Sequence, residues 1–133
     1  MILDSSVLIA AERGAIDLAT ILDGLGKAPL GIAAITASEL LHGVHRAVDA
    51  GTRARRAASV ESMLGLLPVY AFGLREARRH AELWAHLKQR GALIGSHDML
   101  IAATAIARGE SLVTLYAGEF GRVPGLTVIA VNV

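Results

Sequence analysis

The chain has 133 residues, no cysteine and a formal net charge of only +1. Its length fits one domain, residues 1–133, with a single packed core. The lack of cysteine excludes a disulfide framework, a thiolate metal site and a cysteine nucleophile. No apolar run reaches the roughly 18 residues of a membrane span, and the opening Met-Ile-Leu-Asp lacks the basic stretch of a signal peptide. We therefore expect a cytoplasmic protein that makes no contact with membranes.

The small net charge hides an uneven distribution. Residues 42–90 carry nine Lys and Arg against four Asp and Glu, whereas residues 1–41 carry two against five. The basic excess is concentrated in Arg53, Arg55 and Arg56 and in a later group, Arg75, Arg78, Arg79, Lys88 and Arg90. A basic stripe beside an acidic pocket suits a polyanionic substrate. A solvated helix face would give the same pattern.

Short apolar runs alternate with helical patterns along the chain. The runs predict strands at residues 1–3, 29–34, 112–113 and 126–129, and a strand or linker at 68–72. The spacing of apolar residues predicts helices over residues 5–13, 37–49, 52–66, 74–88 and 98–108, with a further helical turn or two within 17–25. Gly51 is expected to separate two of these helices, and a Gly-rich loop to join the last two strands. The alternation predicts an α/β fold, a parallel sheet with helices on both faces.

Three acidic residues stand close to predicted strand ends, at Asp4, Glu39 and Asp98. In open α/β folds the carboxyl ends of parallel strands meet at one edge of the sheet, where ligands bind. Three carboxylates gathered there repel one another unless a cation lies among them. The pattern therefore predicts a divalent-metal site.

Helix capping is the competing interpretation of these acids. Asp is a favoured N-cap residue, and the segment Thr36-Ala-Ser-Glu39 fits a capping box, in which Glu39 accepts a hydrogen bond from the backbone N–H of Thr36. Capping explains any one acid at a helix start. It does not explain why such acids recur beside strand-like runs in a chain with only 12 Asp and Glu.

Other chemistries fit the same residues less well. Aspartyl-phosphate chemistry needs a second carboxylate two positions after Asp4, where the chain has Ser6. A di-iron helical bundle needs two Glu-x-x-His motifs, and the chain has only the one from Glu39 to His42. His42 and His45 lie one helical turn apart, but no convincing third ligand accompanies them.

Four blocks of sequence carry a family resemblance. They are Met1-Ile-Leu-Asp4-Ser-Ser-Val-Leu-Ile, Ser38-Glu39-Leu, Ile94-Gly-Ser-His-Asp98-Met-Leu-Ile-Ala-Ala, and Leu112-Val-Thr114 followed by Glu119-Phe120. In order and spacing the chain resembles the PIN-domain ribonucleases, specifically the VapC-type toxins of toxin–antitoxin pairs, over essentially its whole length. The resemblance implies a PIN-like three-layer α/β/α fold, a metal-dependent endoribonuclease, a homodimer, and a small DNA-binding antitoxin that covers the site. The RNA substrate would be held by Arg53, Arg55 and Arg56.

The resemblance also implies roles for individual residues. Asp4, Glu39 and Asp98 are the expected catalytic residues and the expected ligands of Mg²⁺ or Mn²⁺, with Glu39 bound directly or through water. The ion would activate a water for attack on the phosphodiester. Ser6 and Thr114 would orient that water or a ligand carboxylate. Their alternative roles are those of an N-cap neighbour and a strand-end hydroxyl.

One position departs from the family pattern. Two residues beyond Thr114 the family presents Asp or Asn, whereas this chain has Tyr116. A phenol is a poor ligand for a hard cation. Glu119 lies nearby in the sequence, but it falls on the family's own Glu-Phe position at a helix or loop start, so a substitute for the fourth acid is left open. The alternative function is a degenerate PIN domain that binds RNA or a protein partner without cleavage, and Tyr116 is its only support in the sequence.

Overall fold

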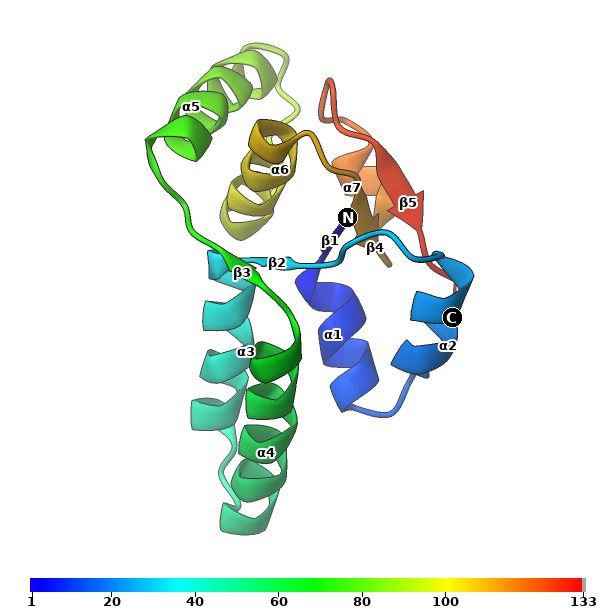
Figure 1. Cartoon of the computed structure of the whole chain (residues 1–133). Coiled ribbons are helices and arrows are strands. Elements are labelled where there is room, and N and C mark those ends of the chain that lie inside the picture. The colour runs from blue at the N-terminus through cyan, green and yellow to red at the C-terminus, as the bar shows by residue number, and fades with distance from the viewer. Residues whose placement is uncertain (133) are drawn as a thin grey trace.

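The strands form one short parallel sheet at the centre of the molecule in a computed structural model that describes residues 1–132 (Figure 1). The strands β1 and β4 pair with each other, β5 pairs with β4, and β2 pairs with β3. A parallel bridge between Ile2 and Gly31 joins the two groups, which gives the spatial order β3-β2-β1-β4-β5. The strands are β1 (Ile2–Leu3), β2 (Ile32–Ala33), β3 (Val69–Tyr70), β4 (Leu112–Thr114) and β5 (Val128–Ala130).

Seven helices connect the strands in the described part of the chain. They are α1 (Ser5–Glu12), α2 (Leu18–Gly24), α3 (Ala34–Arg46), α4 (Ala50–Leu66), α5 (Leu74–Gln89), α6 (Ser96–Arg108) and α7 (Ala117–Phe120). Within residues 1–132, no helix is both long enough and apolar enough to cross a membrane.

The sheet serves two hydrophobic cores, one on each face. Ile2 and Leu112 pack with buried side chains of α5, α6 and α7, while their neighbours Leu3 and Val113 pack with α1, α3 and α4. Successive side chains of a strand point to opposite faces. Strands of two or three residues therefore suffice to anchor helices on both sides, and the predicted three-layer α/β/α fold is confirmed.

The boundary between α3 and α4 differs from the prediction. The helix α3 begins at Ala34, and Gly51 lies inside α4 instead of separating the two helices. The break falls at residues 47–49. There the side chain of Asp49 caps α4 by accepting a hydrogen bond from the backbone N–H of Thr52, at 2.8 Å. A satisfied N-cap fixes a helix start, whereas one glycine near the first turn only weakens the helix.

Two further elements differ from expectation near the candidate site. The helix α6 begins at Ser96, so Asp98 lies in its first turn and follows a turn and loop, not a strand. The connection between β4 and β5, expected to be a Gly-rich loop, contains the short helix α7. Phe120 anchors α7 because its side chain is buried in the core beside α6.

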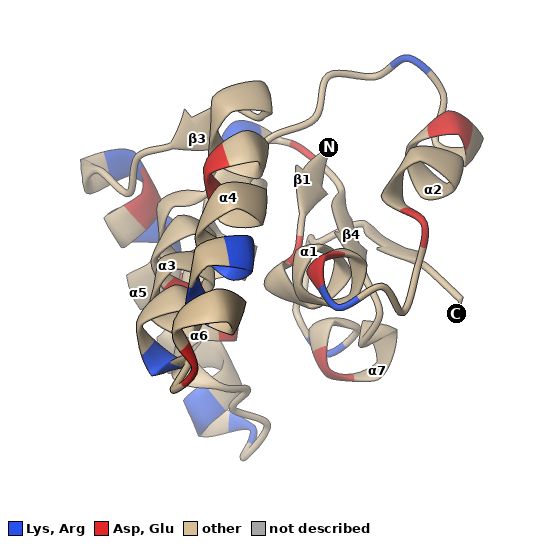
Figure 2. Ribbon diagram, turned by 90° about the horizontal axis from the view of Figure 1, so that it is seen from below, with Lys and Arg blue, Asp and Glu red and all other residues tan. Residues whose placement is uncertain are grey.

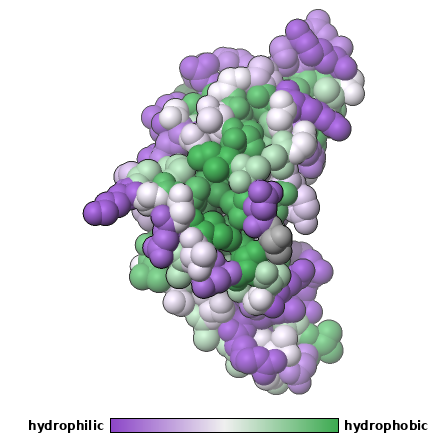
Figure 3. All heavy atoms as spheres, turned by 90° about the vertical axis from the view of Figure 1, so that its right-hand side faces the viewer, coloured by the Kyte–Doolittle hydropathy of each residue, from purple (hydrophilic) through white to green (hydrophobic). Residues whose placement is uncertain are grey.

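Charge and hydropathy are unevenly spread over the surface. Most Lys and Arg residues lie on α4 and α5, and none lies within the bounds of α1, α2 or α7 (Figure 2). Figure 3 shows the face that carries α2 and β5, where apolar side chains gather at the centre and hydrophilic ones surround them. The strand β5 is at the edge of the sheet, and its Val128 and Ile129 are only half-buried. Part of the apolar surface of the sheet edge is therefore left uncovered.

Candidate active site

The three predicted acids meet in one pocket at the carboxyl edge of the sheet. Asp4, Glu39 and Asp98 line this pocket, and a fourth carboxylate, Glu119, lines it with them. The pocket has a volume of about 390 Å³. Its remaining lining comes from Ser5, Ser6, Ile9 and Tyr116. The structure thus brings together acids from α3, α6, α7 and the end of β1.

Asp4 is the most buried of the four acids, with 3% of its surface exposed. It occupies the N-cap position of α1, yet its side chain makes no capping hydrogen bond. Instead its Oδ2 accepts hydrogen bonds from Ser6 Oγ, at 2.6 Å, and from Thr114 Oγ1, at 2.8 Å. The capping interpretation is therefore wrong for Asp4. Ser6 and Thr114 hold its carboxylate in place.

Glu39 reaches the pocket from the second turn of α3. The competing capping-box interpretation is wrong, because Thr36 lies inside the helix and the N-cap position belongs to Ala33. The Ser5 hydroxyl lies 2.8 Å from Glu39 Oε1 and 3.1 Å from Thr36 Oγ1, and donates across the gap between α1 and α3. The start of α1 therefore positions two of the acids, Asp4 through its backbone and Glu39 through Ser5.

The pKa of Asp98 reflects the negative charge of the pocket. Burial and, after it, the nearby charges of Asp4, Glu119 and Glu39 together raise the pKa of its carboxyl to about 6. Among the ion pairs formed within residues 1–132, none joins a Lys or Arg to any of the four carboxylates. The ion pair to these acids that the described residues do form is that of His97, whose Nδ1 lies 3.8 Å from Glu39 Oε2. The pocket therefore concentrates negative charge with little compensation.

Glu119 and Tyr116 both lie at this pocket, which answers a question left by the sequence. Tyr116 is 65% exposed, and its backbone N–H donates to Thr114 Oγ1 at 3.0 Å. Glu119 lies in the first turn of α7, and its Oε1 accepts a hydrogen bond from the backbone N–H of Gly95 at 2.8 Å. This chain has Tyr116 where the family has an acid or amide, but Glu119 brings a carboxylate to the same pocket.

The donor chemistry of the pocket suits a hard divalent cation. Carboxylate and hydroxyl oxygens are the ligands that Mg²⁺ and Mn²⁺ prefer, and this pocket offers four carboxylates beside the hydroxyls of Ser5 and Ser6. Across residues 1–132, no three Asp, Glu or His side chains approach closely enough to enclose an ion as they stand. Water molecules would have to complete the shell, as is usual for Mg²⁺.

The predicted basic cluster lies apart from the acid pocket. Arg53 donates to the backbone oxygen of Ala47 at 2.7 Å, and Arg55 donates to Thr52 Oγ1 at 3.2 Å. Arg56 turns toward α1 and lines a separate hollow there. The structure therefore divides the three arginines, and their contact with RNA stays a prediction.

Known proteins of similar sequence and structure place the chain in a family. The PIN domain family model matches residues 1–126. The chain is 38% identical over 132 residues to ribonuclease VapC1 of Rickettsia felis. The alignment covers 99% of this chain and 96% of the relative. It is 31% identical over 97 residues to the tRNA(fMet)-specific endonuclease VapC of Salmonella typhimurium, covering 73% of this chain and 71% of that protein.

Solved structures agree with the sequence relatives. A chain in the crystal structure of VapBC2 from Rickettsia felis bound to a DNA fragment from their promoter superposes with a TM-score of 0.90 at 28% identity, over 98% of each chain. The match extends over the sheet and the helices on both its faces. The chain belongs to the PIN-domain family and, within it, to the VapC ribonucleases.

Proposed function

We propose that this chain is a metal-dependent endoribonuclease that hydrolyses RNA phosphodiester bonds, and that it is the toxin of a toxin–antitoxin pair. The observation that carries the proposal is the single pocket in which Asp4, Glu39, Asp98 and Glu119 meet. The VapC ribonucleases of similar sequence support the choice of RNA as substrate. The similar VapBC complex on promoter DNA supports a small DNA-binding antitoxin as the protein partner.

The roles of the pocket residues follow from their contacts. Asp4 and Asp98 would hold Mg²⁺ or Mn²⁺, with Glu39 and Glu119 as further donors, directly or through water. A bound ion of this kind lowers the pKa of water and offsets charge on the phosphate under attack. Thr114 keeps the Asp4 carboxylate turned into the pocket through its 2.8 Å hydrogen bond.

Glu119 is proposed to supply the fourth acid in place of the residue at position 116. Its Oε1 is tied to Gly95 at the start of α6, and its charge acts on Asp98. Under this proposal Tyr116, whose ring is largely exposed at the same pocket, is free to contact a base by stacking.

The decisive test compares single-atom changes in the pocket. Asp4→Asn and Asp98→Asn should abolish cleavage of purified tRNA in the presence of Mn²⁺ and weaken Mn²⁺ binding measured by calorimetry. The variants should fold at least as stably as the parent, because removing one charge relieves repulsion. Asp23→Asn, on the exposed surface of α2, is the matched control and should leave both measurements unchanged.

The degenerate PIN domain is the second candidate, because Tyr116 does occupy the pocket. A Mn²⁺ titration separates the two functions. Cleavage of tRNA that appears with Mn²⁺ and disappears with EDTA supports the nuclease. RNA binding without cleavage at saturating Mn²⁺ would favour the degenerate domain, and cleavage that survives EDTA would remove the metal from the proposal.

A further inference from the structure

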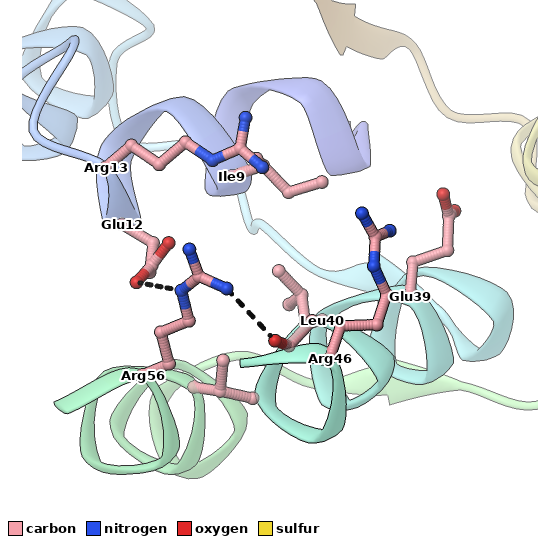
Figure 4. A pocket seen from close by; sticks show the side chains of 9 residues that line it. Ile9, Glu12, Arg13, Glu39, Leu40, Arg46 and Arg56 are labelled. Atoms are coloured by element: carbon pink, nitrogen blue, oxygen red, sulfur yellow. Dashed lines mark hydrogen bonds and ion pairs between the residues drawn. The ribbon is translucent and has the colours of Figure 1, made fainter. Parts of the chain in front are cut away.

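A second hollow adjoins the acid pocket, between α1, α3 and α4 (Figure 4). Its volume is about 80 Å³. Ile9 and Glu39 line both this hollow and the acid pocket, so the two hollows are neighbours along α1 and α3. We call this second hollow the arginine groove, because Arg13, Arg46 and Arg56 line it.

The groove follows one face of α3. Glu39, Gly43 and Arg46 are spaced at four and then three residues, which places them on the same side of a helix. Arg46 begins about 10 Å farther along the helix axis than Glu39, at about 1.5 Å per residue. Gly43 keeps the surface between them low, and a Cβ added there would meet no atom within 4 Å. This face therefore leaves room for an extended single strand of nucleic acid that reaches the acid pocket.

The three arginines of the groove differ in whether their guanidinium groups already form ion pairs. Arg56 is paired, since its Nε lies 3.7 Å from Glu12 Oε1 and its Nη1 donates to the backbone oxygen of Gly43 at 3.3 Å. Arg13 and Arg46 are exposed, and the ion pairs formed within residues 1–132 include neither of them. Figure 4 shows Arg13 extending from α1 and Arg46 from α3 at the same hollow. Two cations therefore remain for an anionic ligand.

We propose that Arg13 and Arg46 bind phosphates of the RNA strand next to the phosphodiester that is cleaved. This inference rests on the proposed ribonuclease function and adds the path of the substrate. The guanidinium group pairs with phosphate oxygens through two parallel hydrogen bonds. A pocket of four carboxylates repels RNA by itself, and cations at its border offset that repulsion where the strand enters.

The proposal shifts the basic contacts away from the residues that the sequence suggested. Arg53 and Arg55 are absent from the lining of the groove, and their guanidinium groups bond to neighbouring atoms of the α3–α4 connection and of α4 itself. Arg56 is in the groove but is held by Glu12 and Gly43. Arg13, at the C-cap of α1, and Arg46, the last residue of α3, by contrast both line the groove beside the acid pocket.

A salt titration of RNA binding tests the inference without requiring cleavage. Fluorescent single-stranded RNA is bound in EDTA by the parent, by the double variant Arg13→Gln with Arg46→Gln, and by a control of equal charge change, Arg78→Gln with Arg122→Gln. Arg78 and Arg122 are exposed and line neither the groove nor the acid pocket. The groove variant should bind more weakly, and its slope of log affinity against log salt should shrink by about 1.4, since each phosphate contact on a single strand contributes about 0.7.

The outcomes separate this inference from the proposed function. An unchanged slope in the groove variant, or an equal change in the control, would overturn the role of Arg13 and Arg46. Unchanged RNA affinity together with lost binding of an octaglutamate peptide would assign the groove to a protein partner and overturn it as well. The binding titration is performed in EDTA, where no cleavage is expected. Failure of the parent to cleave RNA in a separate assay with Mn²⁺ would count against the proposed function and leave the binding result valid.

Discussion

Asp4 depends on its neighbours more than any other residue of the pocket. It is nearly fully buried, and a buried carboxylate is costly unless donors or a cation compensate its charge. The hydroxyls of Ser6 and Thr114 provide two such donors from α1 and β4. Thr114 is itself fully buried, so its hydroxyl is positioned by the sheet. A strand-end threonine therefore sets the orientation of the acid on the neighbouring strand.

Thr114→Val should damage the site while keeping the shape of the side chain. Loss of a donor to a buried charged group should lower the free energy of unfolding by about 1–3 kcal/mol. Mn²⁺ affinity should fall about 10–100-fold, the usual effect of removing a partner of a metal ligand. Urea unfolding and calorimetry measure the two effects.

Thr104→Val is the control, since this buried threonine donates only to the backbone oxygen of Leu100, at 2.8 Å, and should leave Mn²⁺ affinity unchanged. Equal Mn²⁺ affinity in the Thr114 variant would contradict the orienting role.

Asp98 should make the metal-free protein less stable as pH rises. Its pKa is raised from 3.8 to about 6 by burial and by the neighbouring carboxylates, so the folded chain holds this proton more tightly than the unfolded chain. Its contribution to stability is greatest below the unfolded value and is lost as pH rises through the folded value. The free energy of unfolding of the parent, compared with that of Asp98→Asn, should therefore decline as pH rises from 3.8 to about 6.

The measurement is a series of urea unfolding curves for both proteins without metal. Subtraction of the Asp98→Asn curve removes the opposite contributions of groups whose pKa is lowered. An example is Glu110, where burial raises the pKa but the Met1 ammonium and Arg108 lower it by more. Added Mn²⁺ should reverse the decline, because a ligand bound only by the folded state stabilises it. A difference that stays constant with pH would show that Asp98 lacks the expected coupling to the other acids.

At the scale of elements, α6 matters because it carries Asp98 into the pocket. The helix ends at Gly109, whose φ of 65° lies in the left-handed region that favours glycine. Tight packing of α6 against α5 and the sheet then fixes the helix along its length. The position of Asp98 is therefore determined by the packing of its whole helix, while the backbone N–H of Gly95 links the helix start to Glu119.

Gly109→Ala should destabilise the protein by about 1–2 kcal/mol, the cost of the left-handed conformation for a residue with a Cβ. A Cβ at this position would meet no atom within 4 Å, so the effect would come from the backbone alone. Gly65→Ala is the matched control inside α4, where the added Cβ also has free space. It should stabilise the protein by about 0.5–1 kcal/mol. Thermal and urea unfolding compare the two, and equal effects would contradict the backbone argument.

At the scale of the whole molecule, one apolar surface stands out for its large side chains. Phe72, His80 and Trp84 form a row of rings, with centroids 6.0 Å and 6.4 Å apart. Trp84 is 51% exposed and Leu93 is 44% exposed, and the two line a hollow of about 350 Å³ with Met99. Exposed apolar clusters of this kind mark interaction sites. We expect the homodimer that the family resemblance implies to form through this surface.

Trp84→Glu should convert the dimer to a monomer, because burial of an unpaired charge in an apolar interface is unfavourable. Light scattering measures the molar mass over a range of concentrations. Leu66→Glu is the control, since Leu66 is 81% exposed at the end of α4, and it should leave the mass unchanged. A Trp84→Glu variant that remains dimeric at every concentration would move the interface elsewhere.

Features that depend on local pattern are predictable from the amino-acid sequence. Alternating strands and helices predicted the layered fold, because hydrophobic periodicity records which face of each element is buried. Asp4 was identifiable because it directly follows a strand, and Asp98 because its block resembles a known family. Helix starts were less predictable. The N-cap of Asp49 placed the start of α4 ahead of Gly51, contrary to the expected break.

Which distant residues share the site depends on how the helices pack in three dimensions. Glu39 belongs to the pocket through packing of α3 against α1 and the hydroxyl of Ser5, and not through a position at a strand end. Glu119 enters because α7 packs beside the start of α6, a contact across 24 residues of sequence that no local pattern records. Arg13 and Arg46 flank one groove for the same reason. Local propensities fix the elements, whereas the packing of the two cores on the sheet sets which side chains meet.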